Sequence, residues 1–551
     1  MKNNFTEFVL KHFGIFLYFT LSNIFCLVLF SNKIINQGII QDLKYIKSTS
    51  VTLIFIILFV YFLIYILKSK IPYGGGILRF LIIYNFFVIF IQSFLVINFN
   101  NFLNPSFLEA FLNTNMAESI EFVSIYINFK FFGILIFMIV ALFLLKIKIN
   151  IKINNKLNIA FIILIFAVCF GNDLRRAIKY DFSRYINIPF IKFNKELIYT
   201  DDILINSKIM QESYLKIANN HEKLKANENI KNIVLIIGES SRRSAYQDYG
   251  QGLNTTPNLI NIKNKIIYSD VIAPYASTNP VMSVLLNFAN LDNLSERKFY
   301  ENLDIINLFK LANYKTFWIS NQDYISEWGN NAASVGIMSD FSYFTNKYMS
   351  SSDTLSYAKY DGVLLPIIKN LKLSDNNFIV IHLLGNHGNY KKRYPKEFAK
   401  FNESDIKTNI SDKKSIAEYY NSILYTDYII QNIYDIFKND DSLIIYLSDH
   451  AESLYDDKSK SVLGHILDKI TAEIPFIILY SNSFEENHKK LLKDLNKAKD
   501  LPFMSDDLIH LICDIAGIYP IEYKSYLSPL RSDYKKDKIR LFGNELKYNK
   551  F

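Results

Sequence analysis

Residues 232–250 read NIVLIIGESSRRSAYQDYG. The stretch opens with an unbroken run of branched aliphatic side chains at 233–237, which is the composition of a strand buried on both faces of a sheet. Gly238 and a carboxylate, Glu239, follow at once. In open α/β sheets, ligands gather at the carboxyl ends of the strands. The position of Glu239 therefore indicates that a functional site lies at this edge of the sheet.

Similar strand-like runs recur further along the chain. They are YKTFWIS at 314–320, NFIVIHLLG at 377–385, DSLIIYLSD at 441–449 and IPFIILYSN at 474–482. Between two of them, residues 415–437 carry apolar side chains at helical spacing. Strands that alternate with helices predict an α/β domain with a mainly parallel sheet, flanked by helices on both faces. The chain contains no GxGxxG or Walker-type phosphate loop.

The first third of the chain is much more apolar. Of the 551 residues, 50% are hydrophobic and 15% aromatic, which exceeds the share of most soluble enzymes. A helix needs about 20 apolar residues to cross about 30 Å of hydrocarbon. Five runs are candidate spans: 13–30, 51–67, 80–99, 131–145 and 157–170. The last two are short, so a re-entrant or buried helical hairpin is their alternative.

The distribution of lysine and arginine predicts how these spans are oriented in the membrane. Both residue types are concentrated at the N-terminus and in the loops near 68–79 and 146–156, which would face the cytoplasm, whereas the loop at 100–129 has only glutamates as charged residues. An odd number of spans then places everything after 171 outside the cytoplasm. We expect a transmembrane domain at 1–171, a membrane-surface connector with interfacial helix at 172–229, and a globular domain at 230–551.

Cysteine usage and net charge exclude some classes of protein. Cys26 and Cys169 fall in apolar runs, so Cys513 stands alone in the globular domain and no disulfide can form within it. The net charge of +9 is spread over lysine-rich loops, without a basic helix or aromatic platform for nucleic acid. An anionic membrane surface suits this charge better.

Three predicted strands end in residues that can bind metal or phosphate. Glu239 follows the first, His387 follows the strand at 378–384, and Asp449 with His450 follows the strand at 443–447. Carboxylate oxygens with an imidazole nitrogen form a site that Zn²⁺ favours, with Mn²⁺ as the alternative. A single carboxylate at a strand end is more often a helix cap, but three strands together favour a metal site.

A hydroxyl group is available in ASTNPVMSVLLNFAN at 276–290. Asn279 is a candidate N-cap and Pro280 a first helical residue, which would place Thr278 at the positive end of a helix dipole. A hydroxyl in contact with a cation there loses its proton more easily and becomes a nucleophile. The alternative, which spacing alone favours, is that Ser277 and Thr278 only cap the helix.

Taken together, these stretches resemble the lipopolysaccharide phosphoethanolamine transferases, membrane enzymes of the alkaline phosphatase and sulfatase superfamily. The resemblance rests on residues 237–259 and 276–290, GNHGNYKKRYP at 385–395, SDHAESLYDD at 448–457 and LGH at 463–465. It implies five transmembrane helices followed by a sulfatase-like domain. The chain departs from the family in lacking outer-domain disulfides, in Ala451 where glycine is usual, and in Gln251 where an aromatic residue is common.

The resemblance implies a two-step reaction at zinc. Thr278 would share the ion with Glu239, Asp449 and His450, take phosphoethanolamine from phosphatidylethanolamine, and pass it to a lipid A phosphate or core sugar of lipopolysaccharide. His387 and His465 would lie at the phosphoryl group, the ethanolamine or a second zinc. The segment FLNTNMAESIEF at 111–122 resembles the family's region near the lipid substrate. Thr114, Asn115 and Glu118 thereby become candidates for substrate contact.

The same resemblance implies a multi-pass protein of the bacterial inner membrane, monomeric, with its catalytic domain in the periplasm. The nearest alternative is a phosphoglycerol transferase of the lipoteichoic acid synthase type, which also joins five spans to a threonine nucleophile. GNHG followed by RYP favours the ethanolamine enzyme. A sulfatase is disfavoured because no Cys-x-Pro-x-Arg stretch is present. The non-enzymatic alternative is a membrane assembly protein with a hydrolase-like domain.

Overall fold

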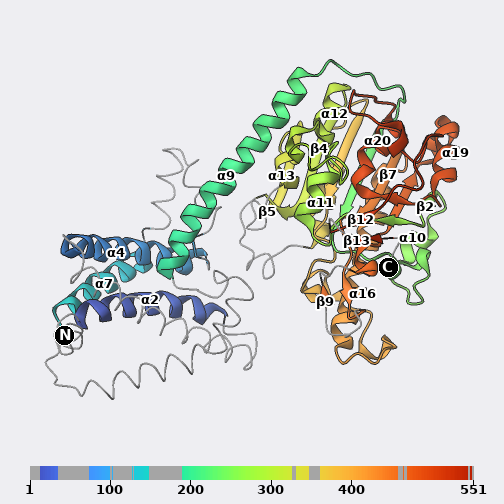
Figure 1. The fold of residues 1–551 in the computed structure, drawn as a ribbon. Helices are drawn as coiled ribbons and strands as arrows, with labels where there is room; N and C mark the ends of the chain where they lie inside the picture. Colours follow the sequence, from blue (N-terminus) through green and yellow to red (C-terminus); the bar gives the residue numbers. More distant parts are fainter. Residues whose placement is uncertain are drawn as a thin grey trace. The chain divides into compact units, whose positions relative to one another are not determined.

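In the computed structural model the chain forms two compact units, Met1–Asp202 and Ile203–Phe551 (Figure 1). The structure describes residues 13–34, 74–99, 102–103, 127, 129–147, 189–324, 331–346, 360–456, 463–464, 468–543 and 546–548.

Apolar helices form the described part of the first unit. They are α2 (Phe13–Ile34), α4 (Gly74–Phe99) and α7 (Phe129–Phe143), the last continued by η1 (Leu144–Lys146). Within them, Gly76–Asn98 and Phe129–Lys146 are long and apolar enough to cross a membrane. The second of these segments contains the short run at 131–145. The runs at 51–67 and 157–170 lie outside the described residues, so five spans remain a prediction.

Polar side chains connect the helices of this unit. Asn23 Nδ2 donates to Asn85 Oδ1 at 3.2 Å, and Asn85 Nδ2 donates to Ser22 Oγ at 3.1 Å. Asn23 Oδ1 also accepts from the backbone N–H of Phe190 at 3.2 Å, at the start of α9 (Pro189–Asn220). The first N–H groups of a helix lack partners within it, so this amide satisfies one of them. Such hydrogen bonds hold apolar helices together where neighbouring surfaces are equally apolar.

The division between the two units falls within helix α9. Phe193 packs in a core cluster of the first unit, whereas Met210 and Tyr214 belong to the main core of the second. The predicted connector at 172–229 thus contains a helix, and its location on a membrane surface stays a prediction. The predicted domain boundaries at 171 and 229 also remain predictions.

A seven-stranded sheet in the order β2-β10-β7-β1-β6-β4-β5 forms the centre of the second unit. Its strands are β1 (Asn232–Gly238), β2 (Lys265–Ile267), β4 (Lys315–Asp323), β5 (Phe341–Asn346), β6 (Asn377–His382), β7 (Ser442–Ser448) and β10 (Phe476–Tyr480). All run in the same direction except β10, which is antiparallel to both its neighbours. The predicted mainly parallel sheet is confirmed, with a strand in each predicted run.

Helices cover both faces of this sheet, and the composition of β1 reflects it. Ile233, Leu235 and Ile237 face one core cluster, while Val234 and Ile236 face the other. On the first face lie α9, α11 (Thr278–Leu285), α12 (Ile305–Leu311), α13 (Asn331–Gly336) and α20 (Leu508–Ala516). On the second lie α10 (Pro257–Asn261), α15 (Leu364–Lys369) and α16 (Lys413–Phe437), which contains the helix predicted at 415–437. A strand covered on both faces must be apolar throughout.

Candidate active site

The site lies where the central parallel strands end. β1 runs between β6 and β7, with Ile237 beside His382 and Gly238 beside Ser448. Glu239 follows β1 directly, and Asp449 follows β7 directly. The backbone N–H of Asp449 donates to Gly238 O at 3.0 Å, which extends the pairing of the two strands by one step. The strand register therefore brings the two carboxylates to neighbouring positions.

Glu239, Asp449 and His450 form a compact and fully buried cluster. One ligand atom from each lies within 4.8 Å of the others, and no other such group occurs in the part of the chain that the structure describes. His450 Nε2 is 3.3 Å from Glu239 Oε1 and 3.5 Å from Asp449 Oδ2. That Asp449 oxygen accepts no hydrogen bond from the described residues, although buried acceptors almost always have one. These three residues could hold a divalent cation.

Thr278 lies against this cluster. Its Oγ1 donates to Glu239 Oε2 at 2.9 Å and is 3.4 Å from His450 Nε2. The hydroxyl therefore contacts two of the three predicted metal ligands, and it makes no cap for its own helix.

The start of α11 differs from the sequence prediction. The helix begins at Thr278, and its N-cap is Ser277, which is extended and makes no side-chain cap bond. The prediction of Asn279 as N-cap and Pro280 as the first helical residue was wrong. Pro280 still fits, because N–H groups of the first helical turn have no partner within the helix. Asn279 Oδ1 instead accepts from the N–H of Asn331 at 3.3 Å.

Ser240 fixes both carboxylates from one position. Its Oγ donates to Glu239 Oε1 at 2.8 Å, and its backbone N–H donates to Asp449 Oδ1 at 3.1 Å. The same Asp449 oxygen accepts from the N–H of His450 at 2.7 Å. Ser240 has a φ of 58°, in the left-handed region that residues other than glycine rarely adopt. Such backbone strain is often found at functional sites, where the surroundings hold it in place.

The loop after β6 packs directly under Glu239. A Cβ atom on Gly385 would lie 2.9 Å from both the backbone N and the backbone O of Glu239, and the φ of Gly385 is +51°. The N–H of Asn386 donates to Glu239 O at 2.9 Å. Asp361 holds the loop from the other side, because its carboxylate accepts from the N–H of Leu384 at 2.8 Å and of Gly385 at 2.9 Å. Glycine at 385 is therefore required by the close approach of the two backbones.

The imidazole of His450 is oriented by the residue that follows it. Its Nδ1 lies 3.1 Å from the carbonyl oxygen of Ala451. A carbonyl only accepts, so Nδ1 carries the proton and Nε2 is left to face the carboxylates. Ala451 plays this role through its backbone, so alanine in place of the family's glycine leaves the interaction intact. Gln251, the other departure, donates from Nε2 to Ser244 O at 3.3 Å.

The charges of these three side chains shift one another's pKa values. Burial opposes ionisation of Glu239, but hydrogen bonding and charge from His450, together with charge from His387, outweigh it and lower the pKa of Glu239. Burial and the negative charge of Glu239 raise the pKa of Asp449 to about 7. For His450, burial opposes the charged form, but Asp449 and Glu239 outweigh it and raise its pKa to about 10. A divalent cation would supply the positive charge that protons otherwise supply here.

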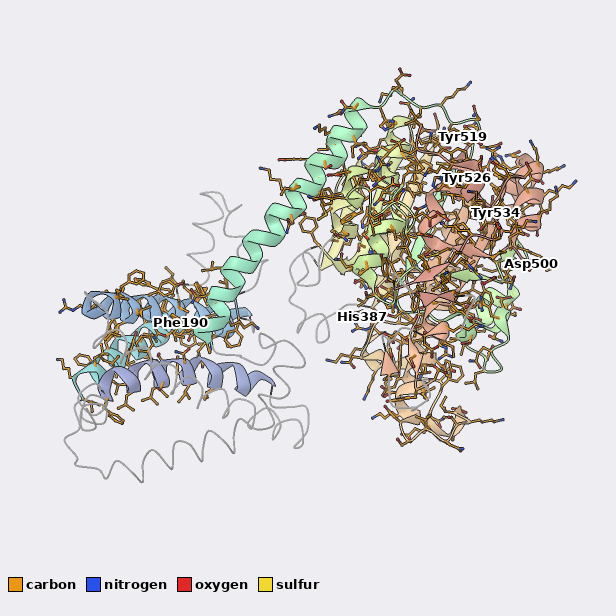
Figure 2. All side chains as sticks on the ribbon, viewed as in Figure 1. Phe190, His387, Asp500, Tyr519, Tyr526 and Tyr534 are labelled. Atoms are coloured by element: carbon orange, nitrogen blue, oxygen red, sulfur yellow. The ribbon has the colours of Figure 1, made fainter. Side chains whose placement is uncertain are left out.

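The other predicted site residues fall into two groups. His387 is half-buried and lies near enough for its charge to affect Glu239 (labelled in Figure 2). His465, Thr114, Asn115 and Glu118 lie outside the described residues. His382, the last residue of β6, is 2% exposed beside Trp318, and burial lowers its pKa to about 4.

One residue at the site was missed by the sequence reasoning. Gln322 Nε2 donates to Glu239 Oε2 at 3.2 Å from the end of β4. Glu239 and Asp449 were identified because they come just after a predicted strand. Gln322 has the same kind of position, just after the strand predicted at 314–320. The amide of glutamine carries no evident catalytic chemistry, so residue type alone did not single out Gln322.

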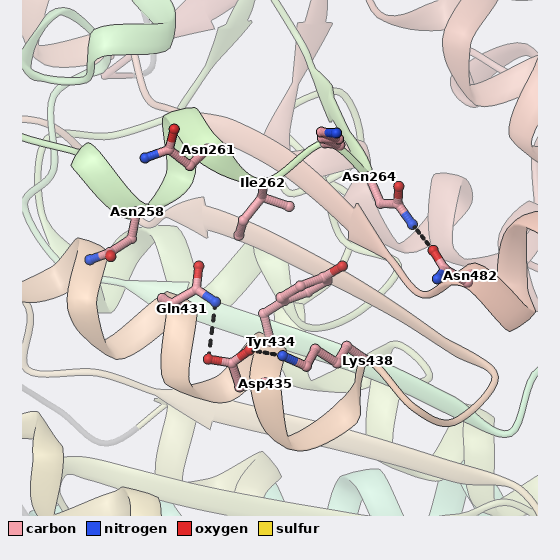
Figure 3. A pocket seen from close by; sticks show the side chains of 10 residues that line it. Asn258, Asn261, Ile262, Asn264, Gln431, Tyr434, Asp435, Lys438 and Asn482 are labelled. Carbon is pink, nitrogen blue, oxygen red and sulfur yellow. Dashed lines mark hydrogen bonds and ion pairs between the residues drawn. The ribbon is translucent and has the colours of Figure 1, made fainter.

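A cavity of about 430 Å³ lies at the opposite edge of the sheet (Figure 3). It is bounded by α10, α16, the residue before β2 and the residue that begins α18 (Asn482–Asn487). Amide side chains dominate its lining, and Asn264 Nδ2 donates to Asn482 Oδ1 at 2.7 Å across one side. Because β2 begins here and the parallel strands end at the other edge, this cavity is separate from the cluster at Glu239.

The second unit contains a segment that matches a known protein family, and the chain has relatives among known proteins. Residues 231–518 match the Sulfatase family model. Phosphoethanolamine transferase EptC of Escherichia coli strain K12 is 30% identical over 334 residues, which is 58% of this chain and 56% of that protein. Phosphoethanolamine transferase EptA of Helicobacter pylori is 30% identical over 271 residues, 46% of this chain and 49% of that protein. The chain thus matches only about half the length of these curated relatives.

Among solved structures, the zinc complex of the C-terminal periplasmic domain of Escherichia coli EptC is similar to the second unit. The TM-score is 0.53 with 26% sequence identity, and the match covers 60% of this chain and 96% of that domain. The likeness extends over almost the whole of that periplasmic domain.

Proposed function

The chain belongs to the sulfatase family, and from that premise we propose that it is a phosphoethanolamine transferase that forms a covalent phosphoethanolamine-threonine intermediate. The observation that carries the proposal is the position of Thr278, whose hydroxyl touches a buried cluster of two carboxylates and an imidazole. The choice of transferred group is supported by the relatives, which are named phosphoethanolamine transferases.

We propose that Glu239, Asp449 and His450 hold zinc. Two carboxylates and an imidazole suit Zn²⁺, and catalytic zinc sites keep a further position open for a reacting group. Thr278 Oγ1 lies against this cluster, and Asp449 Oδ2, which accepts no hydrogen bond from the described residues, would be available as a ligand. When bound, zinc would lower the pKa of the coordinated hydroxyl and offset charge on the phosphoryl oxygens. The zinc complex of the EptC domain supports this choice of metal over Mn²⁺.

We assign the role of nucleophile to Thr278. Its hydroxyl proton is already directed at Glu239 Oε2, so that oxygen can accept the proton as Oγ1 attacks phosphorus. The new Oγ1–P bond forms as the P–O bond to diacylglycerol breaks, and diacylglycerol leaves with the electron pair and takes up a proton. In the second step an acceptor oxygen attacks the same phosphorus, and Thr278 recovers its proton. We assign to His387, whose charge helps to lower the pKa of Glu239, the role of offsetting charge that develops on the phosphoryl oxygens.

We propose phosphatidylethanolamine as donor and a lipopolysaccharide phosphate or sugar hydroxyl as acceptor. The apolar helices Gly76–Asn98 and Phe129–Lys146 support an enzyme of the bacterial inner membrane with its catalytic unit in the periplasm. A donor whose acyl chains stay in the bilayer is best approached by a catalytic unit anchored at the same surface, because anchoring removes most of the cost of bringing the two together.

The test is to look for the covalent intermediate. The purified full-length protein is incubated in detergent with phosphatidylethanolamine, digested and analysed by peptide mass spectrometry. We expect a phosphoethanolamine adduct on Thr278, no adduct in the isosteric Thr278→Val variant, and a normal adduct in Ser277→Ala, because Ser277 makes no side-chain cap bond. A phosphoglycerol adduct formed from phosphatidylglycerol would instead identify the alternative transferase. An unmodified Thr278 in a protein that binds no zinc would favour the non-enzymatic alternative.

A further inference from the structure

The side chain of Gln322 bridges two loops at the edge of the candidate site. Its Nε2 donates to Glu239 Oε2 at 3.2 Å and to the carbonyl oxygen of Leu383 at 3.0 Å. An amide nitrogen has two hydrogens, so each acceptor can receive one. Glu239 is the first residue after β1, and Leu383 is the first after β6. One side chain therefore fixes a predicted metal ligand relative to the neighbouring strand.

An irregularity in β4 brings Gln322 to this position. β4 pairs regularly with β5 as far as Ser320, and the register then shifts before Asp323. The N–H of Gln322 donates to Ser320 Oγ at 3.0 Å, which holds the backbone in this shape. Bulges of this kind re-aim side chains and are common beside active sites. The preceding residue, Asn321, points elsewhere and donates from Nδ2 to Asp361 Oδ1 at 2.8 Å.

Glu239 Oε2 accepts from both Gln322 and Thr278. The bond from Thr278 Oγ1, at 2.9 Å, is the one that the proposed reaction removes, because Thr278 gives up its proton and then carries the phosphoryl group. The bond from Gln322 does not involve Thr278, so it remains once the proton has passed on from Oε2 and Thr278 carries the phosphoryl group. A neutral amide also suits this position because a lysine or arginine would place a positive charge next to the cation and oppose its binding.

We propose that Gln322 is a positioning residue, which keeps the Glu239 carboxylate in its metal-binding orientation throughout the reaction, including the stage at which Thr278 no longer donates to it. This inference rests on the proposed function, since it assumes that Glu239 binds zinc. Partners that orient metal ligands in this way typically contribute about 10-fold to 100-fold to metal affinity.

The test compares Gln322→Met with Gln431→Met in the full-length protein. Methionine has nearly the length and volume of glutamine but no hydrogen-bond donor. Gln431 is half-buried on α16, at the opposite edge of the sheet, and serves as the matched control. Zinc affinity is measured by competition with a chromogenic chelator, and melting temperature is measured on the same samples without zinc.

We expect the dissociation constant for zinc to rise about 10-fold to 100-fold in Gln322→Met and to stay unchanged in Gln431→Met. Gln322→Asn, which keeps the amide but is too short to reach both acceptors, should show a weaker form of the same loss. In transfer assays at saturating zinc, kcat should fall while KM for phosphatidylethanolamine stays constant, because Gln322 acts on a catalytic ligand and not on the donor.

The outcomes separate this inference from the proposed function. If the unaltered protein binds zinc and both Gln322 variants bind it equally tightly, Gln322 has no positioning role and the proposed function stands. If the unaltered protein binds no zinc, the proposed function itself fails. A loss of zinc affinity that merely follows a fall in melting temperature, equal in Gln322→Met and Gln431→Met, would also overturn the positioning role.

Discussion

Replacement of Gly385 by alanine should damage both the stability of the catalytic unit and its metal cluster. The added Cβ would lie 2.9 Å from the backbone N and O of Glu239, a distance that real Cβ contacts essentially never show, and 3.1 Å from its Cβ, which is also unusually close. The atoms it meets are mainly backbone, so they cannot rotate away as the end of a flexible side chain would. Glu239 itself must shift.

Two effects set the magnitude. The φ of +51° at residue 385 costs a residue with a Cβ about 1–2 kcal/mol. Overpacking of a filled interior typically adds about 1–3 kcal/mol. Together they predict a loss of about 2–5 kcal/mol in the free energy of unfolding. A displaced Glu239 also changes the 3.3 Å separation between its Oε1 and His450 Nε2, so zinc affinity should fall as well.

Gly388 provides the matched control within the same GNHG motif. A Cβ at this residue would meet nothing within 4 Å. An alanine at such a position stabilises by about 0.4–1 kcal/mol, because it restricts the unfolded chain. The assay is thermal unfolding of the full-length protein in detergent, with and without zinc, alongside chelator competition. Equal melting temperatures and zinc affinities in Gly385→Ala and Gly388→Ala would refute the close-approach argument.

Two further predictions concern the metal cluster. Glu239→Gln keeps the shape of the side chain but removes its charge, so bound zinc per chain should fall well below that of the unaltered protein when counted by elemental analysis; full retention would remove Glu239 from the ligand set. Zinc affinity should also rise with pH up to about pH 10, most steeply below about pH 7, because zinc must displace protons held by Asp449, whose pKa is raised to about 7, and His450, whose pKa is raised to about 10. Chelator competition at several pH values measures this slope, and a flat profile would contradict the ligand assignment.

The sequence predicted the central strands and the residues at their ends better than it predicted the edge strands. Continuous apolar runs identified the buried strands, and parallel strands that end together brought Glu239 and Asp449 to one edge. The edge strands β2 and β5 were not predicted, because they are short or mix polar and apolar residues, and periodicity needs longer runs to be read.

Local backbone geometry could not be predicted from the sequence. The left-handed Ser240, the start of α11 at Thr278, and the bulge that aims Gln322 at Glu239 each depend on how neighbouring segments pack. None of them has a signature in residue type, because serine, threonine and glutamine occur equally well without such contacts. The convergence of Thr278 on the cluster was therefore a hypothesis until the helix and strand ends could be placed.

The course of α9 determines where the chain can be shortened. Met210 and Tyr214 are nearly inaccessible to solvent, at 6% and 1% exposure, and are packed into the main core of the second unit. A secreted, detergent-free fragment that starts at residue 230 would lack both and would expose an apolar surface prone to aggregation. Starting near Ile203 instead would leave only a frayed helix end in water. A soluble fragment of the second unit should therefore begin within helix α9 and not in the loop that follows it.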